Sequence, residues 1–155
     1  MRIGIGVDAH AFADGRRLVL GGVEIPHERG LDGHSDADVL VHAVIDALLG
    51  AASLGDIGGM FPASEQRWRD AEGLGMLAAV RERVAVHGHK ISNVDATVIA
   101  QEPRLAPHVP AMRSALAAAL HLDATSVSVK ATTTDGMGFT GRGEGIAALA
   151  TVLLE

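Results

Sequence analysis

The 155-residue chain has no cysteine, no tyrosine, and only three phenylalanines and one tryptophan. Without cysteine it can form neither disulfides nor thiolate metal sites, so histidines and carboxylates would have to hold any transition metal. No stretch approaches the roughly 18 consecutive apolar residues of a membrane-spanning helix, and the N-terminus lacks the apolar core of a signal peptide. We therefore expect a cytoplasmic protein with no membrane partner.

The sequence also lacks an excess of positive charge. Thirteen Lys and Arg residues against 19 Asp and Glu residues leave a formal net charge of -6. This argues against nucleic acid as a partner, because phosphate backbones require a basic surface. Hydrophobic residues make up 48% of the chain, which is enough for one globular domain over residues 1–155. Most are alanine, valine and leucine, whose small side chains favour close packing and leave a role for contacts between subunits.

Strand and helix patterns alternate along the chain. Residues 2–10 alternate as a strand that places Asp8 and His10 on the same face. Gly21 and Gly22 predict a hairpin turn between two short strands, 18–20 and 23–25. Further strands are predicted at 91–101, 127–133 and 146–154, and helices at 71–87 and 110–120. This order predicts an α/β fold (α+β, two-layer) in which a mixed β-sheet has helices packed on one face.

Residues 33–50 combine a polar start with an apolar pattern of helical period. Ser35, with Asp38 three residues on, resembles a capping box, and Gly50 is expected to end the helix. His42 lies inside the apolar pattern, where a histidine is often a core residue bonded to a neighbour. Asp46, one turn further on, could orient the imidazole of His42.

Asp8, His10 and His42 together offer three nitrogen and oxygen ligands. That is the usual number of protein ligands for a catalytic zinc, with the fourth position left for substrate or water. The alternative is a solvated strand end beside a core histidine, and spacing alone does not separate the two interpretations.

Two further stretches could bind a nucleotide. Residues 130–145 are rich in threonine and glycine, whose hydroxyls and exposed N–H groups suit phosphate oxygens. Arg142 could pair with phosphate, and Asp135 could hold a hard cation such as magnesium. Residues 100–106 form a proline-stiffened segment that could hydrogen-bond a flat base. Taken singly, the first stretch is better explained as a threonine-rich strand entering a flexible glycine loop, and the second as a turn.

Four long motifs in order carry a resemblance that runs nearly end to end. They are GVDAHAF, GHSDADVLVHAVIDALLGAASLGDIGGMFP, NVDATVIAQEPRLAPH and VKATTTDGMGFTGRGEGIA. Together they resemble the 2-C-methyl-D-erythritol 2,4-cyclodiphosphate synthase family of the non-mevalonate isoprenoid pathway. The resemblance implies a phosphorus–oxygen lyase that converts 4-diphosphocytidyl-2-C-methyl-D-erythritol 2-phosphate to the cyclic diphosphate and releases CMP. The 2-phosphate attacks the β-phosphorus, so no side-chain nucleophile is needed.

The resemblance also implies residue roles. Asp8, His10 and His42 match zinc ligands, and His34 and Thr133 match the catalytic positions that stabilise the transition state. Position 135 matches the ligand of a second cation, magnesium or manganese, although the family more often has glutamate there. The 61–65 loop is expected to close near the substrate. The implied substrate-binding residues are Asp8, Ala9, His10, His34, Ser35, Asp56, Ile57, Gly58, Phe61, Pro62, Ala63, Ser64, Glu65, Ala100, Gln101, Glu102, Pro103, Arg104, Leu105, Ala106, Thr132, Thr133, Thr134, Asp135, Phe139 and Arg142.

Finally, the resemblance implies a homotrimer, with its sheets around a central axis and its active sites between subunits. Phe139 and Arg142 match residues lining a cavity on that axis, where a diphosphate ligand is expected. Two other functions use the same residues. A zinc-dependent nucleotide phosphohydrolase would need a base beside an activated water, for which Asp46 is the best candidate. A non-catalytic trimeric protein would bind a metal, or a ligand in the Arg142 cavity.

Overall fold

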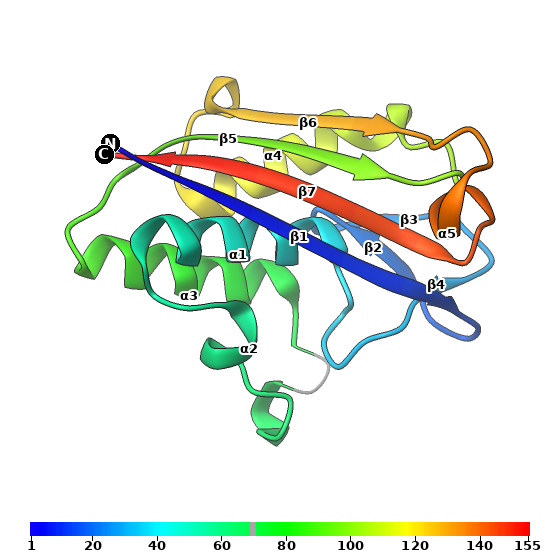
Figure 1. Ribbon diagram of the computed structural model, residues 1–155, viewed down its shortest axis with the longest axis horizontal. Helices are drawn as coiled ribbons and strands as arrows, with labels where there is room; N and C mark the ends of the chain where they lie inside the picture. The colour runs from blue at the N-terminus through cyan, green and yellow to red at the C-terminus, as the bar shows by residue number, and fades with distance from the viewer. Residues whose placement is uncertain (69–70) are drawn as a thin grey trace.

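A computed structural model describes residues 1–68 and 71–155 of the chain. Its main element is a five-stranded mixed sheet (Figure 1). The strand order is β4 (Gly30–Leu31), β1 (Arg2–Ala13), β7 (Gly145–Leu154), β5 (Ile91–Ile99) and β6 (Val127–Thr132). Strands β1 and β5 run antiparallel to β7, whereas β6 runs parallel to β5. The predicted mixed sheet is therefore confirmed.

Three helices cover one face of this sheet, as predicted: α1 (Val39–Ala52), α3 (Gly73–Val86) and α4 (Val109–Leu120) (Figure 1). Helix α1 packs on β1 and β7, α4 packs on β6, and α3 packs on the other two helices. The helices of residues 1–68 and 71–155 all lack the length and hydropathy of a bilayer-spanning segment.

Shorter elements connect these layers. The predicted hairpin is present, with β2 (Leu18–Leu20) paired to β3 (Val23–Ile25). The region 51–70 contains the end of α1, α2 (Ile57–Met60) and the 3-10 helix η1 (Gln66–Trp68). Residues 69–70 of that region lie outside the described residues. The remaining short helices are η2 (Ala106–His108), η3 (Ala124–Ser126) and α5 (Gly138–Gly141), the last inside the expected glycine loop.

Two glycines of β1 let α1 lie directly on the sheet. A Cβ atom at Gly4 would lie 1.9 Å from the carbonyl oxygen of Ala47, and one at Gly6 would lie 1.9 Å from that of Ala43. Both distances are far below van der Waals contact, and the atoms met are backbone, so any larger residue would push the helix away. Because Asp8 and His10 continue the same face of β1, this close approach brings His42 of α1 beside them.

The ends of α1 differ from the prediction. Its N-cap is Asp38, whose Oδ1 accepts from the N–H of Val41 at 3.1 Å, so the predicted cap at Ser35 is wrong. Ser35 instead turns its hydroxyl toward His42. The helix also passes through Gly50 and ends at Ser53, which adopts a left-handed conformation with φ of 59°. Apolar burial of Ala51 and Ala52 extends the helix beyond the glycine, since one glycine costs only about 1 kcal/mol.

Asp38 also fastens the β2–β3 hairpin to the start of α1. Its fully buried carboxylate accepts from the N–H groups of Gly21 at 2.8 Å and Gly22 at 2.6 Å, in addition to Val41. Both glycines have positive φ, which the turn requires. Burial raises the pKa of Asp38 to about 6, against the lowering effect of the three N–H donors.

We predict that Asp38→Ala lowers the free energy of unfolding by about 3 kcal/mol, because three buried N–H groups lose their acceptor. Since the pKa of Asp38 is higher in the folded state than in the unfolded chain, the folded state binds the proton more tightly. The stability contributed by this proton uptake is present below pH 4 and is lost as the pH rises through about 6. The stability advantage of the wild type over the variant should therefore grow on acidification, which urea unfolding at pH 7 and pH 4.5 will measure.

Asp123→Ala is the matched control. Asp123 also accepts from a backbone N–H group at a helix start, that of Thr125, but at an exposed site. Its replacement should cost much less than that of Asp38, because water can bond to the freed N–H group at this exposed site. Equal losses in the two variants would contradict the anchoring role of Asp38.

Candidate functional site

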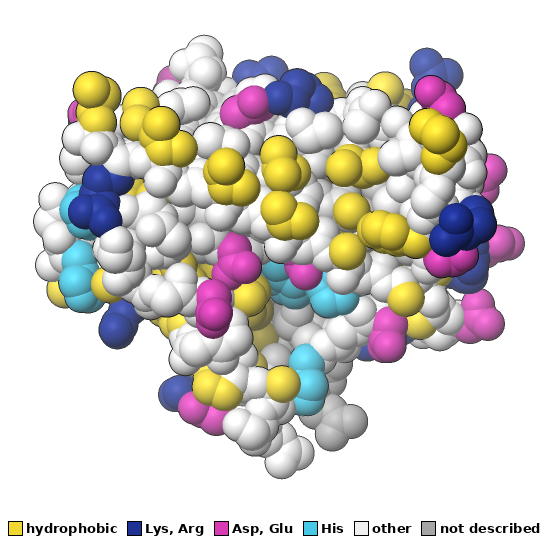
Figure 2. Space-filling model, viewed as in Figure 1, with side chains coloured by type: hydrophobic (Ala, Val, Ile, Leu, Met, Phe, Trp, Pro, Cys, Tyr) yellow, Lys and Arg dark blue, Asp and Glu magenta, His cyan; other side chains and the backbone are white. Residues whose placement is uncertain are grey.

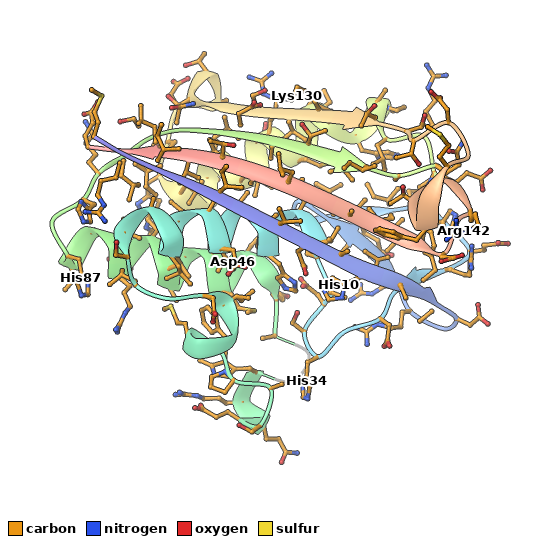
Figure 3. The ribbon with its side chains drawn as sticks, in the orientation of Figure 1. His10, His34, Asp46, His87, Lys130 and Arg142 are labelled. Atoms are coloured by element: carbon orange, nitrogen blue, oxygen red, sulfur yellow. The ribbon has the colours of Figure 1, made fainter. Side chains whose placement is uncertain are left out.

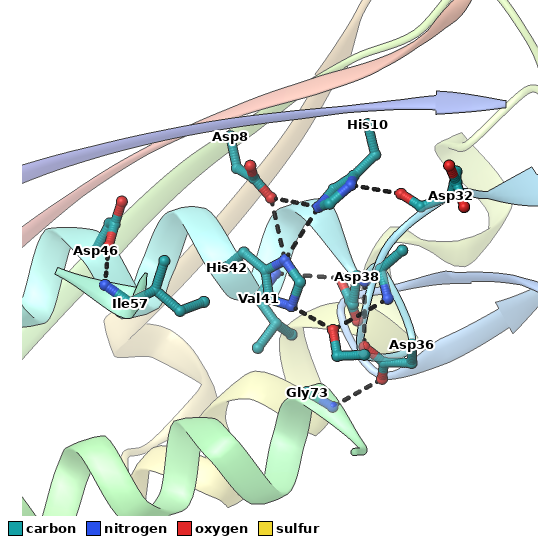
Figure 4. Close-up of polar contacts among 12 residues, drawn as sticks. Asp8, His10, Asp32, Asp36, Asp38, Val41, His42, Asp46, Ile57 and Gly73 are labelled. Atoms are coloured by element: carbon teal, nitrogen blue, oxygen red, sulfur yellow. Dashed lines mark hydrogen bonds and ion pairs between the residues drawn. The ribbon is translucent and has the colours of Figure 1, made fainter. Parts of the chain in front are cut away.

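Asp8, His10 and His42 converge beneath β1 (Figure 4). Oδ2 of Asp8 lies 2.9 Å from Nε2 of His10 and 3.1 Å from Nδ1 of His42, and these two ring nitrogens are 3.2 Å apart. Period-two alternation places the first two side chains on one face of β1, and the close packing of α1 supplies the third. The group predicted from the sequence is therefore assembled within one chain.

The surroundings leave the facing atoms available to a metal. Nδ1 of His10 lies 2.6 Å from the carbonyl oxygen of Asp32, so this nitrogen donates and Nε2 is left with its lone pair. Nε2 of His42 lies 3.0 Å from the hydroxyl of Ser35, on the side of the ring away from Asp8. Such partners fix ring orientation in metal sites. One carboxylate and two imidazoles, so oriented, could bind a metal ion.

Asp8 and His10 shift each other's proton affinity, and His10 and His42 together keep Asp8 ionised. Burial raises the pKa of Asp8, but hydrogen bonds and the positive charge of His10 and His42 outweigh it, and the pKa lies well below its usual range. Burial lowers the pKa of His10, but the hydrogen bond and charge of Asp8 outweigh it and raise the pKa overall. The carboxylate is thus held in the ionised form that a metal ligand requires.

A cavity of about 230 Å³ opens beside this group. Asp8, His10 and His42 line it together with six other predicted residues: His34, Ser35, Ile57, Gly58, Phe61 and Ala63. Trp68 and Met76 also line it and were not predicted. Trp68 meets Phe61 edge-on, with ring centroids 4.7 Å apart. A lone tryptophan in an irregular stretch carried no spacing signal that could have identified it.

A second and larger cavity, of about 570 Å³, lies at the ends of β5 and β6. Its lining contains the whole predicted base-binding segment, 100–106, together with Ala131, Thr132 and Thr133. His27 also lines it and was missed, because it lies in a loop far away in sequence. Its ring stacks on Phe12 with a centroid distance of 5.2 Å.

The two cavities share none of their described lining residues. His34 lines the metal cavity, whereas Thr133 lines the other, so one chain does not bring the two predicted catalytic residues into one cavity. Thr133 donates to Oδ1 of Asp135 at 3.0 Å, and Thr134 Oγ1 lies 2.9 Å from that of Thr140.

The other predicted residues lie at the surface. Ala9 is exposed and alternates away from Asp8 and His10, so it does not face the metal group. Asp56 caps α2 by accepting from Gly59, and Glu65 pairs with Arg67. Pro62 and Ser64 lie in the same connection. Phe139 and Arg142 are exposed near α5, and Arg142 pairs with Glu144 at 2.7 Å.

Asp46 does not orient His42, which corrects the expectation stated above. Oδ1 of Asp46 accepts from the N–H of Ile57 at 2.8 Å, while the ring nitrogens of His42 face Asp8, His10 and Ser35 (Figure 4). Burial raises the pKa of Asp46, although the Ile57 bond opposes the shift. Helix α1 therefore carries His42 of the candidate metal site and, through Asp46, also anchors the start of α2.

Comparisons with known proteins agree with this geometry. The model of the YgbB family matches residues 1–155. The chain is 60% identical, over 154 residues, to the 2-C-methyl-D-erythritol 2,4-cyclodiphosphate synthase of Moorella thermoacetica, covering 99% of this chain and 94% of that protein. The corresponding synthase of Syntrophomonas wolfei is 57% identical over 155 residues, covering 100% and 99%.

Among solved structures, the chain is similar to a 2-C-methyl-D-erythritol-2,4-cyclodiphosphate synthase in a CDP-bound form. The TM-score is 0.91 at 34% identity, over 99% of this chain and 100% of the other. It is also similar to the bifunctional IspDF of Campylobacter jejuni, with a TM-score of 0.95 at 43% identity. That match covers 99% of this chain but only 42% of the bifunctional protein.

We predict that Asp46→Ala speeds amide hydrogen exchange at Ile57 and its neighbours in α2, because this helix loses its tie to α1. The expected loss of local stability is about 1 kcal/mol. Asp46→Asn, which keeps an acceptor oxygen, should retain most of the protection. Unchanged exchange at Ile57 in the alanine variant would show that the bond does not hold α2.

Proposed function

The chain belongs to the YgbB family, and from this membership we propose how its residues carry out the reaction of the 2-C-methyl-D-erythritol 2,4-cyclodiphosphate synthases. The chain is an enzyme of the non-mevalonate isoprenoid pathway, a phosphorus–oxygen lyase. It converts 4-diphosphocytidyl-2-C-methyl-D-erythritol 2-phosphate to the cyclic diphosphate and CMP. An oxygen of the 2-phosphate bonds to the β-phosphorus, and the bond from the β-phosphorus to the bridging oxygen breaks. CMP leaves with that oxygen, and no water is consumed.

The observation that carries the residue assignment is that the three candidate metal ligands share one cavity with His34 and Ser35. Asp8, His10 and His42 would hold zinc, which supplies Lewis-acid stabilisation to a phosphate oxygen when bound. His34 would stabilise the negative charge that develops on the phosphate in the transition state. Ser35 would orient the same group. Because the nucleophile belongs to the substrate, positioning and charge stabilisation supply most of the catalysis.

The second cavity would hold the cytidylate half of the substrate. Backbone groups of 100–106 would read the base, as suggested by a similar structure described as CDP-bound. Thr132 would line the cytidine pocket with this segment, and Thr133 would stabilise the transition state. Asp135 would hold magnesium or manganese; its side chain is one methylene shorter than the more usual glutamate, so water would complete the contact.

At the start of α2, Asp56, Ile57 and Gly58 would bind the ribose and erythritol hydroxyls of the substrate. The 61–65 loop would close beside them. Ala9 would contribute backbone contacts only, since its side chain faces away from Asp8 and His10. Thr134 would also contribute backbone contacts only.

We propose that the active unit is a homotrimer in which each complete site combines the metal cavity of one copy with the cytidylate cavity of a neighbour. The separation of the two cavities within one chain supports this arrangement. So does the sheet face not covered by helices, where Ile3, Ile5 and Val7 are 71%, 65% and 60% exposed (Figure 2). Trimerisation would bury this apolar row around the axis and bring Phe139 and Arg142 of the copies together as a diphosphate site.

The nucleotide phosphohydrolase is not favoured by the structure. It requires a general base beside an activated water. Asp46, its best candidate, accepts from the N–H of Ile57 and is not among the described residues that line the metal cavity.

The reaction is tested by incubating the enzyme with its substrate, zinc and magnesium in ¹⁸O-labelled water and following ³¹P NMR. We expect CMP and the cyclic diphosphate in equal amounts, with no label in either. Linear products carrying ¹⁸O would instead indicate hydrolysis. His42→Ala is the matched control: it should lose zinc and at least 100-fold in kcat, while its circular dichroism spectrum stays unchanged because apolar contacts hold α1.

The shared site is tested by complementation. His42→Ala and Thr133→Ala homotrimers should each be nearly inactive. Trimers co-assembled from equal amounts of the two should recover activity in about a quarter of their sites, where an intact metal group meets an intact Thr133. Failure to recover any activity in verified mixed trimers would show that each copy forms its site alone.

A further inference from the structure

Arg16 reaches across the turn after β1 to the segment that carries His34. Its Nη1 donates to the carbonyl oxygen of Gly33 at 3.1 Å, and its Nη2 donates to that of Ser35 at 2.7 Å. The two acceptors are the residues on either side of His34. One guanidinium group therefore holds both peptide carbonyls that bracket this residue.

The backbone of Arg16 is itself firmly placed. A Cβ atom at Gly30 of β4 would lie only 2.6 Å from the carbonyl oxygen of Arg16 and 2.3 Å from that of Arg17. The chain then enters β2 through Leu18, which is completely buried. A half-buried side chain on a backbone this tightly packed can hold its partners in a defined position.

The segment that Arg16 holds lies in an irregular connection. Residues 32–38 form neither helix nor strand, and His34 projects from the loop between β4 and α1 (Figure 3). The far side of the connection is tied by Asp36, whose Oδ2 accepts from the N–H of Gly73 at 2.7 Å and whose own N–H donates to Ala71. Arg16 supplies the tie on the near side, directly around His34.

We propose that Arg16 is a positioning residue for the cyclisation: it fixes the Gly33–His34 and Ser35–Asp36 peptide planes, and with them the imidazole of His34 in the metal cavity. Arginine suits this role because its planar fork presents two donors in fixed geometry, which the single ammonium of lysine does not. Arg16 does not itself contact the substrate. The inference rests on the proposed role of His34.

Arg17 provides a charge-matched control in the same turn. Its guanidinium is exposed and pairs with Glu24 at 3.1 Å across the β2–β3 hairpin. Replacing either arginine by methionine removes one positive charge and keeps an unbranched side chain. The two variants therefore differ in the contacts to Gly33 and Ser35.

In steady-state assays, Arg16→Met should lower kcat by about ten- to a hundredfold with KM changed less than about threefold, because a displaced catalytic group acts mainly on the transition state. Arg16→Lys should recover only part of the loss, and Arg17→Met should match the wild type. Added guanidinium at non-denaturing concentration should partly rescue Arg16→Ala but not His34→Ala. Equal effects of the two methionine variants, no rescue, or loss of bound zinc in Arg16→Met would overturn the proposal.

A double-mutant cycle identifies the residue through which Arg16 acts. In a His34→Ala background, Arg16→Met should lower kcat by less than about threefold, since the group that it positions is already gone. Independent, multiplicative losses would overturn the proposal. The His34→Ala variant alone separates this failure from another: if it keeps wild-type kcat, the role proposed for His34 is itself wrong.

Discussion

The close contact between β1 and α1 is the constraint on which the rest of the structure depends. It exists because Gly4 and Gly6 have no Cβ, and the backbone of α1 occupies the space that those atoms would take. A helix held at this distance buries nearly all of its side chains and forms the centre of the core. The same packing places Ala47 and Ala43 over the two glycines and sets His42 opposite Asp8 and His10. Fold and metal group thus follow from one packing interaction.

Polar ties then fix the irregular segments around this contact. Asp38 holds the hairpin turn to the start of α1, and Asp46 holds α2 to the middle of the same helix. Arg16 and Asp36 hold the two sides of the His34 connection. Each of these side chains reaches backbone groups far away in sequence. Such ties place loop residues on rigid elements, which is what a reaction that relies on positioning requires.

The division between two cavities is the main structural support for the proposed homotrimer. One cavity contains the metal group and His34, the other contains the base-binding segment and Thr133, and the parallel pairing of β5 with β6 forms the second. In the proposed reaction, one substrate molecule would contact both cavities. The uncovered apolar face of the sheet offers the means of bringing two copies together.

Much of this protein could be predicted from the sequence by itself. Local periodicity identified the strands and helices, and the alternation of β1 placed Asp8 and His10 on one face, because these properties depend on neighbouring residues alone. The extended motifs identified the family and its candidate residues. Only the tertiary structure decided that Asp38 rather than Ser35 caps α1, that Asp46 serves α2, and that Arg16 brackets His34. Some of these contacts join residues that are 11 or more positions apart, and others compete with local alternatives. A local sequence pattern does not encode which of several polar partners the folded chain brings within reach.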